Sequence, residues 1–288
     1  MIDSEKIFPI GIGTFRIDLN QKEESFNSLM KSIELGQNYI DTSHLYEDGK
    51  VMSFIGEFIK KLDRKEIFIV TKIEPTVEKI EDIELQLNKY LDMMDIEYVD
   101  CLMLHSALFT NLSLLDTYKE MNRMVEIGKV KKLGLSNSTL EQLQEINSNY
   151  KISIYEGIYN LECKINEDIG IVDYCKNNDI IFCAYQPLRR NRTANRKYPL
   201  LVDLSKKYNK TQNQIILNWI IKEKKMNILI KSTNIIRIEE NIDSIKFEMN
   251  KEDYEKLNVF RVKEFDLVNI DWEGRGGVTV DQLANQFE

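Results

Sequence analysis

Asp41, Tyr46, Lys72 and His105 supply four side chains that exchange protons: a carboxylate, a phenol, an ammonium group and an imidazole. Asp41 lies near the end of an apolar run, and Tyr46 lies in the segment just after it. Lys72 and His105 end the next two apolar runs of the chain. If these runs are parallel strands of one barrel, their carboxyl ends meet at one face. The four groups then share a site suited to acid–base chemistry.

Each of the four also has an ordinary structural explanation when it is considered alone. Tyr46 is one of 13 tyrosines, and a tyrosine in a loop is usually a packing or surface residue. Lys72 fits a strand that emerges into solvent, and His105 fits a buried, hydrogen-bonded histidine. Asp41 fits a residue that caps a loop. Their joint position at successive strand ends is what favours a functional site.

The elements that must position these residues follow from the alternation of apolar, β-branched runs with amphipathic segments, which is typical of repeated βα units. We expect strands at 7–14, 39–43, 67–73, 99–106, 132–137, 152–160, 180–188 and 226–233. We expect helices at 22–35, 50–62, 77–93, 115–127, 140–147, 167–177 and 200–224. Gly36 and Gly128 suit the left-handed residue beyond a helix end. Ser138 and Thr139 are candidate caps for the helix that begins at Leu140.

Eight strands, each followed by a helical segment, predict an α/β fold, a single (β/α)8 TIM barrel domain over residues 1–288. A doubly wound nucleotide-binding fold is the main alternative. Its glycine fingerprint requires a third glycine after Gly11 and Gly13, at the position where this chain has Arg16. The barrel is therefore favoured. We expect the segment from about Asn258 onward to form a loop and tail over the barrel mouth.

The composition, with 43% hydrophobic and 30% charged residues, is typical of a soluble globular protein. A formal net charge of −8 argues against a general nucleic-acid-binding protein, which needs a basic surface. Four cysteines without a C-x-x-C pair and only two histidines argue against a zinc site or a disulfide framework. We therefore expect no metal and a cytoplasmic location. No apolar run approaches the roughly 20 residues that span a bilayer. The oligomeric state cannot be predicted.

The chain resembles the aldo-keto reductase family over most of its length. The matching motifs are Gly11-Ile12-Gly13-Thr14-Phe15, Asn38-Tyr39-Ile40-Asp41-Thr42-Ser43 with Tyr46, Thr71-Lys72, Leu104-His105, Gly134-Leu135-Ser136-Asn137, Tyr185-Gln186-Pro187-Leu188, and Lys231-Ser232 with Arg237, Glu240 and Asn241. The resemblance implies a barrel enzyme that reduces an aldehyde, ketone or sugar carbonyl with NADPH. It also implies that Asp41, Tyr46, Lys72 and His105 form the catalytic tetrad of that family.

Carbonyl reduction explains why the tetrad contains these residue types. A hydride must reach the carbon and a proton the oxygen, but a tyrosine with a pKa of about 10 is a weak acid at neutral pH. The ammonium of Lys72 would stabilise the tyrosinate and lower that pKa, and Asp41 would hold the ammonium in place. Tyr46 could then act as general acid in reduction and as base in oxidation. His105 would orient the carbonyl oxygen.

The resemblance assigns the adenosine end of the cofactor to residues after the last strand. Lys231, Ser232 and Arg237 match the positions that hold the 2′-phosphate, and Glu240 and Asn241 match those that hold the adenine. Two cations near a helix start suit a dianionic phosphate. NADPH is therefore favoured over NADH. A solvated helix face explains Arg237 alone, but it leaves the spacing of the other four residues unexplained.

The nicotinamide end matches the family with one exception. Ser136 and Asn137 match the positions that bind the carboxamide, Tyr185 matches the aromatic residue that stacks on the ring, and Thr14 lies in the first matching motif. Where the family usually has glutamine, this chain has Glu156. An ionised glutamate accepts hydrogen bonds but cannot donate them, so it can still receive the carboxamide NH2. We expect Glu156 to keep that role with altered cofactor affinity.

Two loops also depart from the family. Glu47-Asp48-Gly49-Lys50 follows Tyr46 in place of the usual Gly-x-Ser/Asn-Glu. A basic run, Arg189-Arg190-Asn191-Arg192 with Arg196 and Lys197 close behind, replaces glycine and small residues after the seventh strand. One explanation is a clamp for the cofactor pyrophosphate or for an anionic, phosphorylated or nucleotide-linked substrate. The other is a solvated loop.

Two other functions fit parts of the pattern. A redox-sensing binding module would keep the fold and the cofactor but act through a partner with little turnover. A barrel lyase would use Lys72 as a Schiff base, but it leaves the residues from Lys231 to Asn241 without a role. The substrate cannot be predicted, because it depends on loop shapes and on the tail around Trp272 and residues 274–277.

Overall fold

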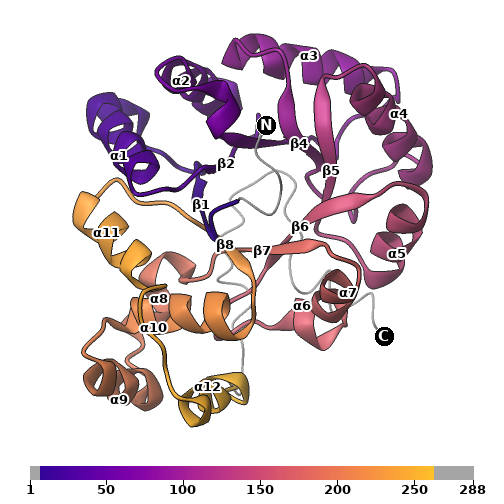
Figure 1. Cartoon of the computed structure of the whole chain (residues 1–288). Helices are drawn as coiled ribbons and strands as arrows, with labels where there is room; N and C mark the ends of the chain where they lie inside the picture. The colour runs from indigo at the N-terminus through magenta and orange to yellow at the C-terminus, as the bar shows by residue number, and fades with distance from the viewer. Residues whose placement is uncertain (1–6, 263–288) are drawn as a thin grey trace.

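Eight parallel strands close into a barrel in the order β1 to β8, which confirms the predicted (β/α)8 fold (Figure 1). The computed structural model describes residues 7–262. The strands are β1 (Ile10–Gly13), β2 (Tyr39–Asp41), β3 (Phe68–Ile73), β4 (Val99–Leu104), β5 (Val130–Ser136), β6 (Ile152–Ile158), β7 (Ile181–Tyr185) and β8 (Asn227–Ile230). The first strand pairs with the last, so that Ile10 lies beside Ile228 and Ile12 beside Ile230.

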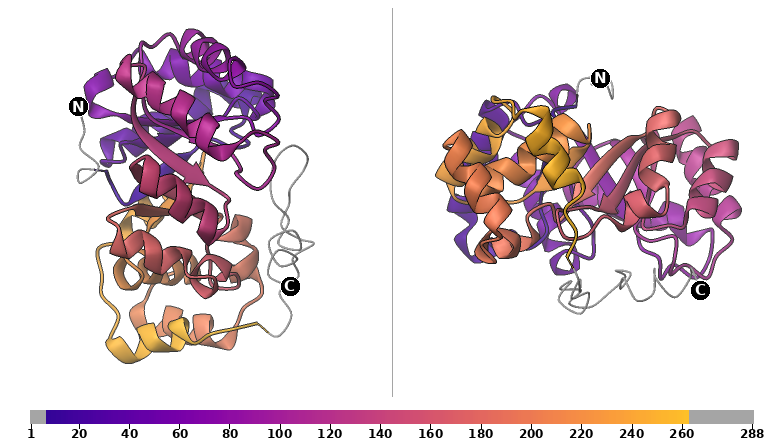
Figure 2. Two further views of the ribbon diagram at one scale, coloured as in Figure 1. Left: turned by 90° about the vertical axis from the view of Figure 1, so that its right-hand side faces the viewer. Right: turned by 90° about the horizontal axis from the view of Figure 1, so that it is seen from below.

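Helices surround the barrel and cover the outer face of its strands (Figure 1). They are α1 (Lys22–Glu34), α2 (Lys50–Ile59), α3 (Asp82–Met94), α4 (Leu114–Glu126), α5 (Leu140–Asn149), α6 (Ile165–Asp168), α7 (Ile171–Asn177), α8 (Arg192–Asn195), α9 (Pro199–Tyr208), α10 (Gln212–Asn218), α11 (Ile235–Asp243) and α12 (Lys251–Asn258). In Figure 2 the helices α9 to α12, in orange and yellow, lie together at one side of the barrel.

The strands carry two apolar clusters, one on each face. Val70 of β3 and Met103 of β4 belong to a small cluster of strand residues inside the barrel. Ile69 and Leu102, one position earlier in each strand, belong to the larger cluster between strands and helices. Successive side chains of a strand point to opposite faces. Every second residue of these strands therefore points into the barrel. Polar residues at the same alternating positions point into the barrel as well.

Several local predictions are confirmed by the backbone. Gly36 and Gly128 both have a positive φ, of 96° and 82°, just after α1 and α4. The side chain of Thr139 accepts a hydrogen bond from the backbone N–H of Gln142, and the side-chain oxygen of Gln142 accepts one from the backbone N–H of Thr139. This reciprocal pair satisfies two free donors of the first turn of α5.

Two predicted helices are interrupted in the structure. Residues 167–177 divide at Gly170, which has a φ of +85° and separates α6 from α7. Residues 200–224 divide at Asn209, which is left-handed and ends α9, and Thr211 then caps α10 with Gln214. Helix α12 was not predicted. The predicted tail beyond residue 262, with Trp272 and residues 274–277, lies outside the described residues.

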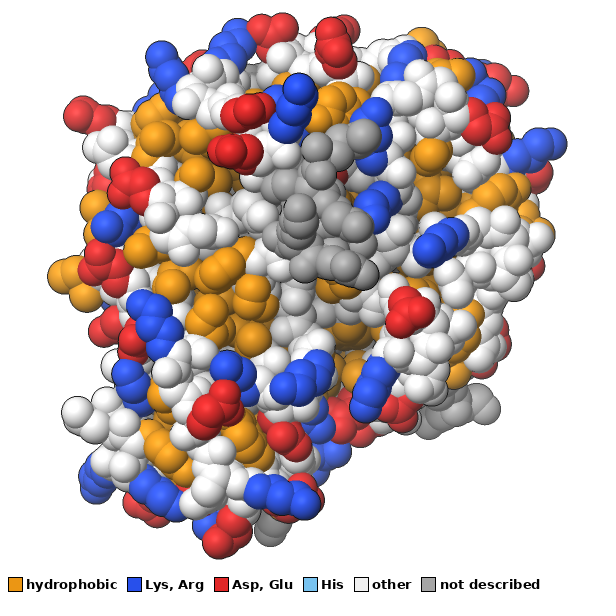
Figure 3. Space-filling model, in the orientation of Figure 1, with side chains coloured by type: hydrophobic (Ala, Val, Ile, Leu, Met, Phe, Trp, Pro, Cys, Tyr) orange, Lys and Arg blue, Asp and Glu red, His pale blue; other side chains and the backbone are white. Residues whose placement is uncertain are grey.

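The surface carries charges of both signs. On the face seen in Figure 3, Lys and Arg side chains are interspersed with Asp and Glu side chains. None of the helices within residues 7–262 is long and apolar enough to cross a membrane. In the same part of the chain, no three His, Cys, Asp or Glu residues are arranged to hold a metal ion.

Candidate active site

Asp41, Lys72 and Glu156 lie inside the barrel because each stands two positions after a residue of the inner cluster. The preceding inner residues are Tyr39, Val70 and Ile154. Side chains two positions apart on a strand point to the same face, so Asp41, Lys72 and Glu156 also point into the barrel. They lie toward the carboxyl ends of β2, β3 and β6. The strand pattern thus builds a polar layer directly above an apolar one.

Lys72 is the centre of this layer. Its Nζ atom pairs with Oδ1 of Asp41 and lies 3.2 Å from Oε2 of Glu156. The hydroxyl of Tyr46 donates to Oδ2 of Asp41 over 3.3 Å, and the Lys72 ammonium lies 5.7 Å from the centre of the Tyr46 ring. Lys72 and Asp41 are 2% and 4% exposed, so this ion pair is shielded from water. The structure therefore brings three of the four predicted catalytic residues into one network.

His105, the fourth, joins the network from the end of β4. Its ring centre lies 6.2 Å from that of Tyr46, and its Nδ1 atom lies 3.3 Å from Oγ of Ser43. Burial, and then the positive charge of Lys72, lowers the pKa of His105 to about 3. The imidazole is therefore neutral at physiological pH. A neutral ring with Nδ1 facing Ser43 has its second nitrogen available to bond a carbonyl oxygen.

The pKa of Tyr46 corrects one sequence-based expectation. Lys72 lowers this pKa, as predicted. However, burial raises it first, and the negative charges of Asp41 and Glu156 raise it further. The net result is a pKa well above the ordinary value of a tyrosine. Tyr46 is therefore a phenol that donates to Asp41, and it is not a tyrosinate stabilised by Lys72.

The ionisation of Lys72 bears on the Schiff-base alternative. Burial lowers its pKa, but the charges of Asp41, Glu156 and Tyr46 oppose this effect, and the net pKa lies well above that of a free lysine. A Schiff base requires a neutral amine, which lysines gain through a lowered pKa. The ion pairs of Lys72 therefore disfavour a lyase.

The predicted nicotinamide residues form a second connected group next to the tetrad. The hydroxyl of Tyr185 donates to Oδ1 of Asn137 over 2.7 Å. The Nδ2 atom of Asn137 donates to Oγ of Ser136 and to the backbone carbonyl of His105, both over 3.0 Å. Thr14 is fully buried and donates to the backbone carbonyl of Asp41 over 2.8 Å. Thr14 thus fixes the end of β2 that carries the catalytic carboxylate.

Glu156 makes contacts that the sequence does not predict. It is 1% exposed, and its Oε1 atom accepts a hydrogen bond of 2.6 Å from the hydroxyl of Tyr39. Its Oε2 atom faces Lys72. Each carboxylate oxygen has two lone pairs, so Glu156 retains capacity to accept a further hydrogen bond. Its predicted contact with the carboxamide remains a prediction.

The predicted adenosine residues lie where β8 ends and α11 begins. Lys231 and Ser232 follow β8, and Arg237, Glu240 and Asn241 lie three and four residues apart on α11, where they share one face. Lys231 and Arg237 are exposed.

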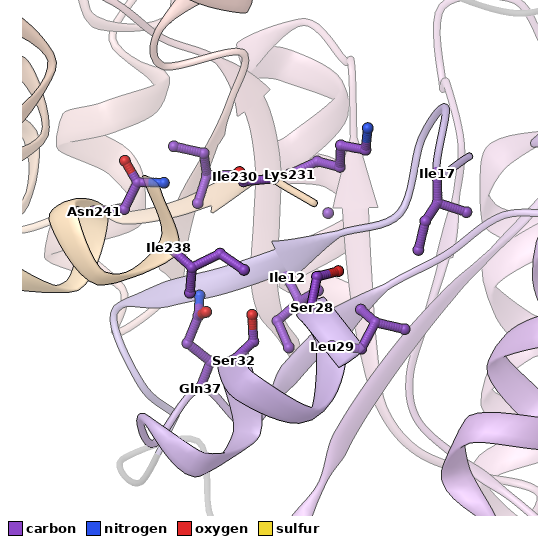
Figure 4. A pocket seen from close by; sticks show the side chains of 12 residues that line it. Ile12, Ile17, Ser28, Leu29, Ser32, Gln37, Ile230, Lys231, Ile238 and Asn241 are labelled. Atoms are coloured by element: carbon purple, nitrogen blue, oxygen red, sulfur yellow. The ribbon is translucent and has the colours of Figure 1, made fainter. Parts of the chain in front are cut away.

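Figure 4 shows this region around a small pocket of about 10 Å³, with Lys231 and Asn241 on either side of Ile230. A larger groove of about 760 Å³ lies between the start of α1 and the start of α11. It is lined in part by Lys22, Asn234 and Ile236, and Ile236 is 68% exposed.

The basic run after β7 is neither a uniform clamp nor a solvated loop. Arg189 is 3% exposed and pairs with the buried carboxylate of Glu162, which Arg196 also approaches at 3.7 Å. Arg190 lies 6.0 Å from the centre of the Phe15 ring. Phe15 in turn packs on Tyr46, with ring centres 5.2 Å apart. Arg189 therefore supports the loop, while Arg190 lies near Phe15, the ring that packs on Tyr46.

Comparison with known proteins identifies the family to which this site belongs. The sequence profile of the aldo/keto reductase family matches residues 9–261. The chain belongs to the aldo/keto reductase family. It is 27% identical to aldo-keto reductase family 1 member C18 of Rattus norvegicus, over 89% of this chain and 88% of that protein. It is 25% identical to glyoxal reductase of Bacillus subtilis, over 88% and 89%.

Solved aldo-keto reductases share the barrel. A thermostable aldo-keto reductase in complex with the inhibitor epalrestat is 28% identical, with a TM-score of 0.81 over 88% of this chain and 94% of that one. An aldo-keto reductase of Klebsiella pneumoniae in complex with NADPH is 20% identical, with a TM-score of 0.81 over 94% and 95%. Membership in the aldo/keto reductase family confirms the prediction of an oxidoreductase that acts on carbonyl groups.

Three residues of this aldo/keto reductase site lie in the matching motifs but were given no role by the sequence analysis. Tyr39 bonds Glu156, Ser43 lies on His105, and Phe15 packs on Tyr46. Tyr39 belongs to β2, the strand that carries Asp41, Ser43 lies two residues after that strand, and Phe15 is the last residue of the first family motif. The period of two along β2 could have indicated that Tyr39 and Asp41 point the same way. The hydrogen bond of Tyr39 to Glu156, on the other side of the barrel, could not have been found from this pattern.

Proposed function

We propose that this chain reduces an aldehyde, ketone or sugar carbonyl to an alcohol with NADPH, and that Tyr46 is the general acid. One observation carries the proposal. The hydroxyl of Tyr46 lies 3.3 Å from the carboxylate of Asp41, which pairs with Lys72, and the neutral ring of His105 lies beside it. An acid, its charged supports and an uncharged hydrogen-bond donor therefore meet at one barrel end, where barrel enzymes carry their sites.

Each residue has a separate task in this proposal. Tyr46 gives its phenolic proton to the carbonyl oxygen as the carbon gains a hydride, and it regains a proton from solvent afterwards. Lys72 stabilises the negative charge left on Tyr46, and Asp41 keeps the ammonium in place. His105 donates a hydrogen bond to the carbonyl oxygen without adding charge, because its pKa of about 3 keeps the ring neutral.

The residues around the tetrad fit a nicotinamide cofactor, which supplies the hydride when bound. Tyr185, Asn137 and Ser136 are already linked by hydrogen bonds next to the acid. An amide and a hydroxyl can bond a carboxamide on both its donor and acceptor sides. Glu156 supplies an additional acceptor for the carboxamide NH2, and Thr14 secures the neighbouring strand end.

The preference for NADPH over NADH rests on the segment after β8. Lys231 and Arg237 are exposed cations at the start of α11, and Ser232 lies between them in sequence. Such groups form charge-assisted hydrogen bonds to a phosphate. Glu240 and Asn241 follow on the same helix for the adenine. The similarity to a Klebsiella pneumoniae aldo-keto reductase solved with NADPH agrees with this assignment.

We assign the substrate to small carbonyl compounds, with a preference for those that carry a negative charge. Support comes from Arg190, which lies beside Phe15 next to Tyr46. Arg189 forms a buried ion pair with Glu162, so we do not assign it to substrate binding. The reaction is assigned to the cytoplasm, where the free thiols of Cys101, Cys163, Cys175 and Cys183 stay reduced.

The proposal is tested by following NADPH oxidation across a panel of aldehydes, ketoses and sugar nucleotides. We expect turnover with at least one aldehyde class and weaker turnover with NADH. Binding of NADPH without turnover over the whole panel would instead support a redox-sensing module. Borohydride trapping of a substrate on Lys72 would support a lyase.

A further inference from the structure

Glu156 places a second carboxylate on the catalytic lysine. Lys72 of β3 lies between Asp41 of β2 and Glu156 of β6, and its Nζ atom is within contact distance of both carboxylates. Asp41 and Glu156 are 4% and 1% exposed. Two buried negative charges therefore share one buried positive charge, and with both carboxylates ionised this group of three carries a net charge of −1.

Tyr39 fixes Glu156 in this position. Its hydroxyl donates to Oε1 of Glu156 over 2.6 Å, which leaves Oε2 directed at Lys72. The Tyr39 ring is 1% exposed and lies so close to Gly11 that a Cβ atom on Gly11 would overlap with it. The ring packs edge-on against Phe68, at a centre distance of 5.8 Å. A packed ring that donates a hydrogen bond to Glu156 gives this carboxylate a defined orientation.

Within residues 7–262, the groups whose pKa the charge of Glu156 shifts include a single cation. Those that interact with it electrostatically come from β2, the loop after β2, β3, β4 and β7, and they are Tyr39, Asp41, Tyr46, Lys72, Cys101, Cys183 and Tyr185. Lys72 is the one cation in this set. His105, the other basic group of the predicted tetrad, is neutral because burial, and then the charge of Lys72, lowers its pKa to about 3.

The extra negative charge of Glu156 acts on Asp41 and on Tyr46. Burial, and then the charge of Glu156, raises the pKa of Asp41, although Lys72 lowers it. Burial and the charge of Asp41 raise the pKa of Tyr46, and Glu156 adds to this increase. A negative charge opposes the formation of another negative charge nearby. Glu156 therefore disfavours the tyrosinate that Lys72 favours.

We propose that Glu156 is a positioning residue that partly neutralises Lys72 and holds Tyr46 in its phenol form, which biases the site toward carbonyl reduction and against alcohol oxidation. This inference rests on the proposed function. Reduction needs the phenol as proton donor, whereas oxidation needs the phenolate as proton acceptor. A neutral glutamine at position 156 would leave Lys72 with a single counter-ion, and the phenolate would form more easily.

The test uses Glu156→Gln, which keeps the size and the hydrogen-bond acceptor for Tyr39 but removes the charge. The first readout needs neither cofactor nor substrate: phenolate absorbance is titrated in each protein and in the same protein carrying Tyr46→Phe, and the difference isolates Tyr46. We expect its titration to move down by at least about one pH unit in Glu156→Gln, because one unit corresponds to a tenfold change in ionisation. Glu156→Asp, which keeps the charge, should stay near the wild type.

The second readout is the ratio of oxidation to reduction. In Glu156→Gln, kcat for alcohol oxidation at neutral pH should rise about tenfold, in line with the shift in ionisation, while kcat for reduction changes less. Glu162→Gln is the matched control, since Glu162 is an equally buried glutamate that pairs with Arg189 instead. It should leave the Tyr46 titration unchanged. An unshifted Tyr46 titration in Glu156→Gln would overturn the proposal.

Two further outcomes keep the inference separate from the proposed function. If Glu156→Gln does not fold, the wild type still tests the idea, because a Tyr46 phenolate that forms well below pH 10 would contradict it. If Tyr46→Phe retains full carbonyl reduction while Glu156→Gln shifts the Tyr46 titration, the charge effect stands and the proposed role of Tyr46 fails. A loss of NADPH affinity in Glu156→Gln without a titration shift would support the carboxamide role alone.

Discussion

Oε2 of Glu156 lies 3.2 Å from Nζ of Lys72, although β6 and β3 are separated by two other strands of the barrel. The same ammonium pairs with Asp41 of β2. One buried cation thus joins carboxylates from different sides of the barrel. Because all three groups are buried, none of them can exchange its partner for water, and the charge of Lys72 is needed by the fold as well as by the chemistry.

Lys72→Met should destabilise the protein by about 3–5 kcal/mol, because it leaves two buried carboxylates without their cation. Urea unfolding measures the change. Adding Glu156→Gln should recover part of the loss, since only one unpaired carboxylate then remains. Lys256→Met is the control: its ammonium is partly exposed and pairs with the exposed carboxylate of Glu252 and with Asp253, whose carboxylate keeps Lys207 as a second cation, so its loss should change stability much less than Lys72→Met does. Equal stability of Lys72→Met and the wild type would be inconsistent with this network.

His105 should make the protein less stable in acid. Its folded pKa of about 3 lies below the ordinary value of 6.5, so between these values the unfolded chain binds a proton that the folded chain does not. The unfolding free energy therefore falls as the pH is lowered through this window, by about 1.4 kcal/mol per pH unit from this group. His105→Gln removes the contribution, and urea unfolding at pH 4, 5 and 6 should show a shallower dependence. An identical dependence would mean that His105 is protonated in the folded state.

Lys231→Ala and Arg237→Ala should each raise the Kd for NADPH by about tenfold, the effect of losing one charge-assisted hydrogen bond to a phosphate. The Kd for NADH, which lacks the 2′-phosphate, should change less than about twofold by the same reasoning. Quenching of protein fluorescence by each cofactor measures both values. Lys251→Ala, at the start of α12, serves as a control for the loss of a positive charge elsewhere. Equal weakening of NADH and NADPH binding would rule out recognition of the phosphate here.

Arg190→Ala should raise KM for carboxylated or phosphorylated aldehydes several-fold and leave KM for neutral aldehydes unchanged, because Arg190 lies near Phe15, which packs on Tyr46. A loss of one exposed charge contact is worth roughly 1 kcal/mol, or about fivefold. Lys197→Ala removes an exposed cation of the same basic run and is the control. The idea fails if both variants, or neither, change the preference for anionic substrates.

The fold and the tetrad could be predicted because both depend on short-range patterns. Alternation of apolar residues along β3 buries Val70 and points Lys72 the same way. The carboxyl ends of parallel strands meet at one face, so Asp41, Lys72 and His105 had to converge once the barrel was assigned. Family motifs added Tyr46 and the residues after β8.

The balance of charges inside the barrel could not be predicted in this way. The contact of Tyr39 with Glu156 joins residues 117 positions apart, and no local pattern encodes it. The raised pKa of Tyr46 follows from burial and from two carboxylates around one lysine, which only the three-dimensional arrangement reveals. The same is true of Arg189, whose basic neighbours suggested a surface role although Glu162 holds it in the interior.

The central claim is that Tyr46 gives the proton that completes carbonyl reduction. Tyr46→Phe removes the hydroxyl group that carries this proton. The decisive measurement is kcat for NADPH-dependent aldehyde reduction by Tyr46→Phe, with the Kd for NADPH determined on the same protein. Tyr150→Phe, a half-buried tyrosine between α5 and β6, is the control. We predict that kcat of Tyr46→Phe falls by about 100-fold or more, the range for loss of a general acid, with unchanged NADPH affinity. Wild-type kcat in Tyr46→Phe would contradict the claim.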